Sequence, residues 1–114
     1  MYDLIIKGGT LVDPDQGIND VRDIAIQDGK IARIAQSIAI EEAIRVVEVA
    51  GKMVTPGLID LHTHVYDGMN ANGVEADLGG VRAGVTTMVD AGSSGCDTYG
   101  GFPRHIIPNN KTEI

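Results

Sequence analysis

Two histidines separated by one residue, His62 and His64, have the type and spacing that are typical of metal ligands. Alternate side chains of a β-strand point to one face, so in a strand over residues 58–65 both share a face with Asp60. Polar groups buried there without partners would cost about 1–3 kcal/mol each. One divalent cation bound by both imidazoles would satisfy them, because neutral imidazole is a preferred ligand of zinc, iron, nickel and copper.

The surroundings of the pair favour this interpretation over the alternatives. Most His-x-His pairs are surface residues or core residues that bond a backbone carbonyl. Here a Pro56-Gly57 turn leads into an apolar strand, and a predicted helix follows it. Sites of α/β barrels lie at the C-terminal ends of the strands, which is where His62 and His64 fall. We therefore interpret the two histidines as metal ligands.

The elements that position the pair follow a strand–helix–strand pattern after Pro56. Strands are predicted over residues 58–65 and 85–89, and residues 91–101 are a loop rich in Gly and Ser. A helix between the strands is predicted from an apolar stripe and ends near Gly84; the stripe consists of Val74, Leu78, Val81 and Val85. Strand, helix and strand within about thirty residues predict a parallel βαβ unit.

The preceding residues, 1–55, alternate short β-branched runs with turn signals. Gly8-Gly9 is expected to break the first strand, and Asp28-Gly29 is a tight-turn pair because both positions tolerate positive φ. Residues 38–43 could form a short helical turn. The strands, expected to be antiparallel and part of a β-sandwich, cover residues 2–6, 10–12, 24–27, 31–34, 44–49 and 53–55.

Charge and composition exclude several classes of partner. The net charge of −7 repels phosphate backbones and anionic lipid headgroups, so neither a nucleic acid nor a membrane is an expected partner. The single cysteine, Cys96, cannot form an internal disulfide and fits a reducing compartment. The sequence has neither a secretory signal nor an apolar run of about 18 residues. We expect a cytoplasmic protein.

The run Val-Thr-Pro-Gly-Leu-Ile-Asp-Leu-His-Thr-His over residues 54–64 resembles the first metal-binding motif of the amidohydrolase superfamily. That superfamily includes dihydroorotases, hydantoinases, allantoinases, D-aminoacylases and related deacetylases. Residues 2–14 and 23–34 are similar to its N-terminal strands and hairpin, and residues 84–90 to its second barrel strand. The resemblance implies a mixed fold, in which residues 1–55 are strands of a β-sandwich and residues 56–114 are the first two βα units of a truncated (β/α)₈ TIM barrel.

By this resemblance, His62 and His64 bind the more buried metal of a centre with one or two divalent ions, zinc being the expected metal. Asp60 would help to hold the histidine-bearing strand, or would accept hydrogen bonds from local backbone donors. Asp90 would line the substrate pocket, or would only form a turn. Ser93, Ser94 and Gly95 could offer backbone N–H groups to an anion, although a plain loop is the simpler interpretation. His105, which has no partner at ligand spacing, is expected on the surface.

The resemblance implies a metal-dependent hydrolase that cleaves C–N bonds in amide, cyclic amide or N-acyl small molecules through a metal-activated water. A barrel needs about 200 residues at least, and residues 56–114 are far fewer. The later ligands and the catalytic Asp of the family pattern therefore have no counterpart, and the 114 residues alone are expected to be inactive. The alternative is a non-catalytic, truncated β-rich binding or assembly module. A homo-oligomer remains open in both cases.

Overall fold

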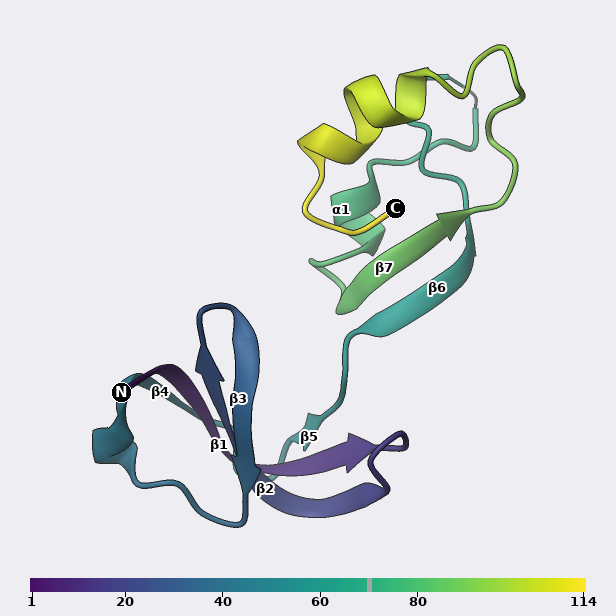
Figure 1. The fold of residues 1–114 in the computed structure, drawn as a ribbon. Helices are drawn as coiled ribbons and strands as arrows, with labels where there is room; N and C mark the ends of the chain where they lie inside the picture. The colour runs from purple at the N-terminus through teal and green to yellow at the C-terminus, as the bar shows by residue number, and fades with distance from the viewer. Residues whose placement is uncertain (70) are drawn as a thin grey trace. The chain divides into compact units, whose positions relative to one another are not determined.

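The computed structural model describes residues 1–69 and 71–114. The chain divides into two compact units, Met1–Pro56 and Gly57–Ile114. Each unit has its own β-sheet, five-stranded in the first and two-stranded in the second (Figure 1). In the part of the chain that the structure describes, no helix has both the length and the apolar character needed to cross a bilayer.

The first unit is a mixed sheet with the strand order β3-β2-β1-β4, and β5 also pairs with β1. Its strands are β1 (Tyr2–Asp13), β2 (Ile18–Gln27), β3 (Lys30–Ala35), β4 (Ala43–Glu48) and β5 (Met53–Val54). β1 to β3 form an antiparallel meander, as expected. The expectation of antiparallel pairing is wrong for β4 and β5, which run parallel to β1. The connection after β3, with the 3₁₀ helix η1 (Ile40–Glu42), carries the chain across the sheet, so β4 enters in the direction of β1. The helical turn predicted over residues 38–43 is confirmed.

The two glycine turns of this unit behave differently. Asp28 and Gly29 have φ angles of 52° and 71° and join β2 to β3, which confirms the predicted tight turn. Gly8-Gly9 does not end the first strand, because β1 continues to Asp13 with a register shift between Ile6 and Gly9. Gly8 has a φ of 75°, and a Cβ on Gly9 would lie 2.5 Å from Val54 Cγ2. The glycine pair therefore makes a β-bulge that lets β5 approach β1 closely.

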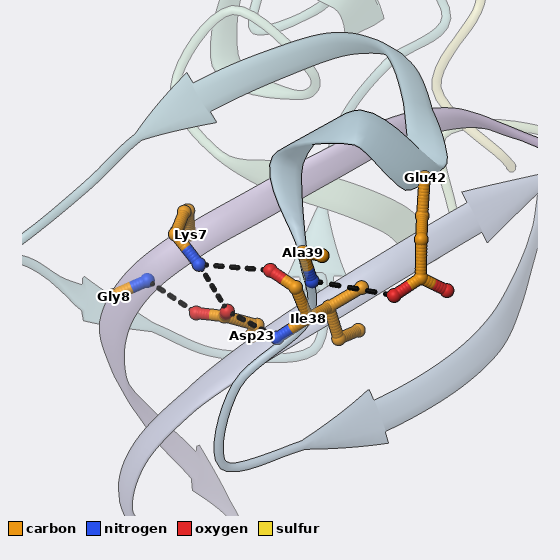
Figure 2. Close-up of polar contacts among 6 residues, drawn as sticks. All are labelled: Lys7, Gly8, Asp23, Ile38, Ala39 and Glu42. Carbon is orange, nitrogen blue, oxygen red and sulfur yellow. Dashed lines mark hydrogen bonds and ion pairs between the residues drawn. The ribbon is translucent and has the colours of Figure 1, made fainter.

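Asp23 anchors the connection between β3 and β4 to the sheet (Figure 2). Its buried carboxylate accepts hydrogen bonds from Lys7 Nζ at 2.7 Å and from the backbone N–H groups of Gly8 and Ile38, both at 2.8 Å. Lys7 Nζ also donates to the Ile38 carbonyl at 2.9 Å. Burial would raise the pKa of Asp23, but the hydrogen bonds from Lys7, Ile38 and Gly8 outweigh it and hold that pKa below its usual value. The network fixes Ile38 over the core residues Ile5 and Ala25.

The second unit is built on two parallel strands, β6 (Leu58–Thr63) and β7 (Val85–Asp90), which lie side by side in Figure 1. The predicted parallel pairing is confirmed. Its core consists of Val65, Tyr66, Ala76, Met88 and Phe102. In the described part of this unit, the helical segments are α1 (Ala76–Gly79), η2 (Phe102–Ile106) and η3 (Ile107–Asn109). Glu113 forms a parallel bridge with Thr87 on β7, so residues near the C-terminus also pair in the parallel direction.

The predicted helix between the strands is mostly wrong. α1 has four residues, Val74 and Leu78 of the predicted apolar stripe are 51% and 54% exposed, and Ala76 is the buried residue instead. Gly79 and Gly80 follow within one turn, and each glycine costs a helix about 1 kcal/mol relative to alanine. The C-cap is Gly80 rather than the expected Gly84, which has a φ of 91° in the turn before β7.

Candidate metal centre

The two histidines and Asp90 lie at the same edge of the parallel sheet. His62 is the second-last residue of β6, His64 follows the strand directly, and Asp90 is the last residue of β7. Thr63 and Asp90 are register partners, and the backbone N–H of Ala91 donates to the Thr63 carbonyl at 2.8 Å. Parallel pairing therefore brings the carboxyl ends of both strands together.

The two imidazole rings lie within the separation that one shared cation would allow. The ring centroids of His62 and His64 lie 5.6 Å apart with an interplanar angle of 80°. With Zn–N bonds of about 2.0–2.1 Å, the centres of two imidazoles on one ion can lie at most about 6.4 Å apart. His62 is exposed and His64 is half-buried, so both rings are accessible to an ion. Among residues 1–69 and 71–114, no group of three or more His, Cys, Asp and Glu side chains is arranged to hold a metal. His62 and His64 are thus two candidate ligands.

A hydrogen-bond network ties His64 to the end of β7. His64 Nδ1 lies 3.0 Å from Ser93 Oγ. Asp90 Oδ1 accepts from the Ser93 backbone N–H at 2.7 Å, and Asp90 Oδ2 accepts from the Val65 N–H at 2.8 Å. Burial would raise the pKa of Asp90, but the hydrogen bonds of Ser93 and Val65, with the nearby His64, hold that pKa below its usual value. Asp90 is thus an anion that joins the two strand ends.

The structure relates the predicted Asp60 and Asp90 to specific partners. Asp60 is exposed, and its Oδ1 accepts from the His62 backbone N–H at 3.1 Å. This matches the predicted alternative in which Asp60 accepts hydrogen bonds from local backbone donors. Asp90 accepts from Ser93 three residues later, as a turn former does, and it also lines a cavity of about 340 Å³. Neither histidine lines this cavity, whose walls include Met88, Tyr99 and Phe102.

The remaining predicted positions lie in the loop after β7 and on η2. In the loop, the Ser93 N–H donates to Asp90 and the Gly95 N–H donates to Thr98 Oγ1, so two of the three N–H groups considered for an anion bond within the protein. Cys96 is a free, exposed thiol. His105 lies on η2, where its carbonyl accepts from Asn109 Nδ2. Sequence reasoning missed the contact between Ser93 and His64, although both follow strands that end at one edge of the sheet.

Curated relatives of this chain are dihydroorotases. The dihydroorotase of Geobacter sulfurreducens is 47% identical over 64 residues, which is 56% of this chain and 15% of that protein. The dihydroorotase of Streptococcus pneumoniae serotype 4 is 37% identical over 89 residues, 75% of this chain and 21% of that protein. The chain thus spans about one fifth or less of the length of these relatives. No family model matches the sequence.

Solved structures of enzymes are similar to this chain in fold. A dihydroorotase structure matches with a TM-score of 0.86 and 29% identity, covering 100% of this chain and 30% of that one. An adenine deaminase matches with a TM-score of 0.83 and 34% identity over 98% of this chain and 29% of that one. An N-acyl-D-glutamate deacylase of Bordetella bronchiseptica, solved with zinc and a phosphonate inhibitor, matches with a TM-score of 0.63 and 30% identity, covering 78% and 18% of the two chains.

Proposed function

The chain belongs to the amidohydrolase superfamily, and we propose that it contributes the first two metal ligands, His62 and His64, to a hydrolase of C–N bonds. The substrate class is a small molecule with an amide, a cyclic amide or an N-acyl group. The dihydroorotase relatives and the zinc-bound deacylase neighbour support this range of substrates. The observation that carries the proposal is the 5.6 Å separation of two imidazoles at the carboxyl end of a parallel strand.

The chain's own residues have defined tasks in this proposal. His62 and His64 would hold a divalent cation, for which zinc is the first candidate, and Asp90 would keep the two strand ends together through Val65 and Ser93. A bound divalent cation polarises a carbonyl and makes water a nucleophile near neutral pH. A catalytic zinc normally has three protein ligands, so we propose that other parts of the whole protein supply further ligands and the general base. This dependence makes the 114 residues alone inactive.

The proposed architecture of the whole protein is a β-sandwich beside a (β/α)₈ barrel. The mixed sheet of residues 1–56 would be part of the sandwich, and β6 and β7 would be the first two barrel strands. The parallel bridge between Thr87 and Glu113 supports continuation of the parallel sheet past β7. Ile59 and Leu61 of β6 are 62% and 74% exposed, as expected for side chains that other barrel elements would cover.

The exposed apolar side chains of β6 also favour a second candidate function. A non-catalytic β-rich module would use these exposed side chains, and the edge of β6 that β7 does not pair with, to bind another chain or a second copy of itself. The two candidates differ in what the whole protein does with metal. In the hydrolase the metal is required for turnover, whereas in the module it is not. We place the protein in the cytoplasm in both cases, which the single Cys96 supports.

The test is turnover by the full-length protein on a panel of dihydropyrimidine, hydantoin and N-acyl amino acid substrates. We expect zinc-dependent hydrolysis of at least one member and loss of that activity by a factor of about 10³ or more in the His62→Ala/His64→Ala variant, because two ligands of the activating ion are gone. His105→Ala is the matched control, since His105 lies on η2, and it should retain activity. Hydrolysis that survives in the double variant would refute the proposal.

A further inference from the structure

We propose that Ser93 is a positioning residue that holds His64 in the tautomer with its proton on Nδ1, so that Nε2 presents a lone pair to the metal. This inference rests on the proposed metal site and assigns a role to a residue outside the ligand pair. The observation behind it is the 3.0 Å contact between His64 Nδ1 and Ser93 Oγ.

The direction of this hydrogen bond follows from what the ligand must do. A neutral imidazole carries one proton, on Nδ1 or on Nε2, and only the nitrogen without the proton can bind a cation. Because Nδ1 faces the hydroxyl oxygen of Ser93, the nitrogen available to an ion is Nε2. In the tautomer that binds the metal through Nε2, the Nδ1–H group therefore donates and Ser93 Oγ accepts. Ligand histidines commonly have such a partner on their second nitrogen.

Ser93 is itself held in place, which distinguishes it from a loop serine that touches a ring by chance. Its backbone N–H donates to Asp90 Oδ1 at 2.7 Å, and Asp90 Oδ2 accepts from the N–H of Val65, the residue after His64, at 2.8 Å. The Asp90 carboxylate thus binds both Ser93, which contacts the His64 ring, and Val65, which directly follows His64. The closed circuit of three hydrogen bonds runs between the ends of β6 and β7 and fixes the ring relative to the sheet.

The same residues do not form a serine nucleophile with its base. A nucleophilic triad requires the carboxylate to orient the histidine through the ring nitrogen that does not face the serine. Here Asp90 accepts from the backbone amides of Val65 and Ser93, and its side-chain hydrogen-bond partner is Ser93 and not the His64 ring. The arrangement orients an imidazole and does not activate a hydroxyl group.

The test is the tautomer of His64, read from long-range ¹H–¹⁵N correlation spectra of the metal-free full-length protein at about pH 8.5, where free imidazole is neutral. We expect the Nδ1–H form in the wild type and a shift toward the Nε2–H form, which free imidazole side chains prefer, in Ser93→Ala. This variant removes only the hydroxyl and keeps the backbone N–H that bonds Asp90. Ser94→Ala is the matched control, because Ser94 is also half-buried and adjacent, and Ser93→Thr should restore the Nδ1–H form. An Nε2–H wild type, or a tautomer unchanged in Ser93→Ala, would overturn the inference.

Zinc binding by the same variants separates this inference from the proposed function. In the full-length protein we expect Ser93→Ala to weaken zinc binding by about 10- to 100-fold, the usual effect of losing the partner of a ligand histidine. If the wild type binds no zinc while the tautomer depends on Ser93, the proposed function fails and the positioning role stands. If zinc binds and Ser93→Ala changes neither affinity nor tautomer, the positioning role fails alone.

Discussion

Replacing Asp23 with alanine is expected to destabilise the first unit by about 3–5 kcal/mol, the range for removing one member of a buried ion pair. Three donors lose their acceptor: Lys7 Nζ and the backbone N–H groups of Gly8 and Ile38. Ile38 is 1% exposed, so its N–H cannot reach water and alone costs about 1–3 kcal/mol. Lys7, whose side chain is 24% exposed, recovers part of its hydration, which keeps the total near the lower end.

The assay is urea unfolding followed by far-UV circular dichroism, because the chain has no Trp and only three Tyr. The matched control is Asp20→Ala, which removes the exposed ion pair between Asp20 and Arg22 on the same strand. Exposed pairs contribute little, so Asp20→Ala should leave the unfolding midpoint nearly unchanged. Equal midpoints for Asp23→Ala and Asp20→Ala would show that the network around Asp23 does not anchor the β3–β4 connection.

The remaining predictions concern acid, packing and the C-terminal segment. The pKa of Asp23 is lower in the folded state than the unfolded value of about 3.9. Its stabilisation is therefore complete above that value and is lost as pH falls through the folded pKa. Below about pH 4, the free energy of unfolding should fall less steeply with decreasing pH in Asp23→Asn than in the wild type. Gly9→Ala should destabilise the sheet by about 1–3 kcal/mol through overpacking against Val54. Gly100→Ala is the control, because its Cβ would meet open space, and it should not destabilise the protein. Equal melting temperatures of the two variants would contradict the close approach of β5 to β1. Asp77→Ala should speed amide hydrogen exchange at Thr112 several-fold, because Asp77 accepts from its N–H and hydroxyl; unchanged exchange would mean that Asp77 does not fix the segment.

Local signals in the sequence predicted the elements around the histidines well. The strands predicted over residues 58–65 and 85–89 match β6 and β7 to within two residues, and the strand–helix–strand pattern predicted their parallel pairing. Asp28-Gly29 predicted its turn because only residues that tolerate positive φ suit both positions. These features depend on neighbouring residues, which a single sequence displays directly.

Features set by distant residues could not be predicted in the same way. The parallel entry of β4 depends on where the β3–β4 connection crosses the sheet, and that path is fixed by Asp23 accepting the Ile38 N–H fifteen residues away. The apolar stripe of residues 74–85 predicted a long helix, but Asp77 bonds residues 111 and 112 and glycines follow it, so the helix stops after one turn. The partner of His64 likewise comes from a loop twenty-nine residues later.

The zinc affinity of the protein, measured by competition with a chromogenic chelator, tests the central claim most directly. We expect zinc to bind the full-length protein at neutral pH. In the His62→Ala/His64→Ala variant, zinc affinity should fall by a factor of about 10² or more, because two direct ligands are removed. His105→Ala should bind zinc like the wild type. Equal zinc affinity in the double variant and the wild type would contradict the claim that the paired imidazoles at the end of β6 hold the metal.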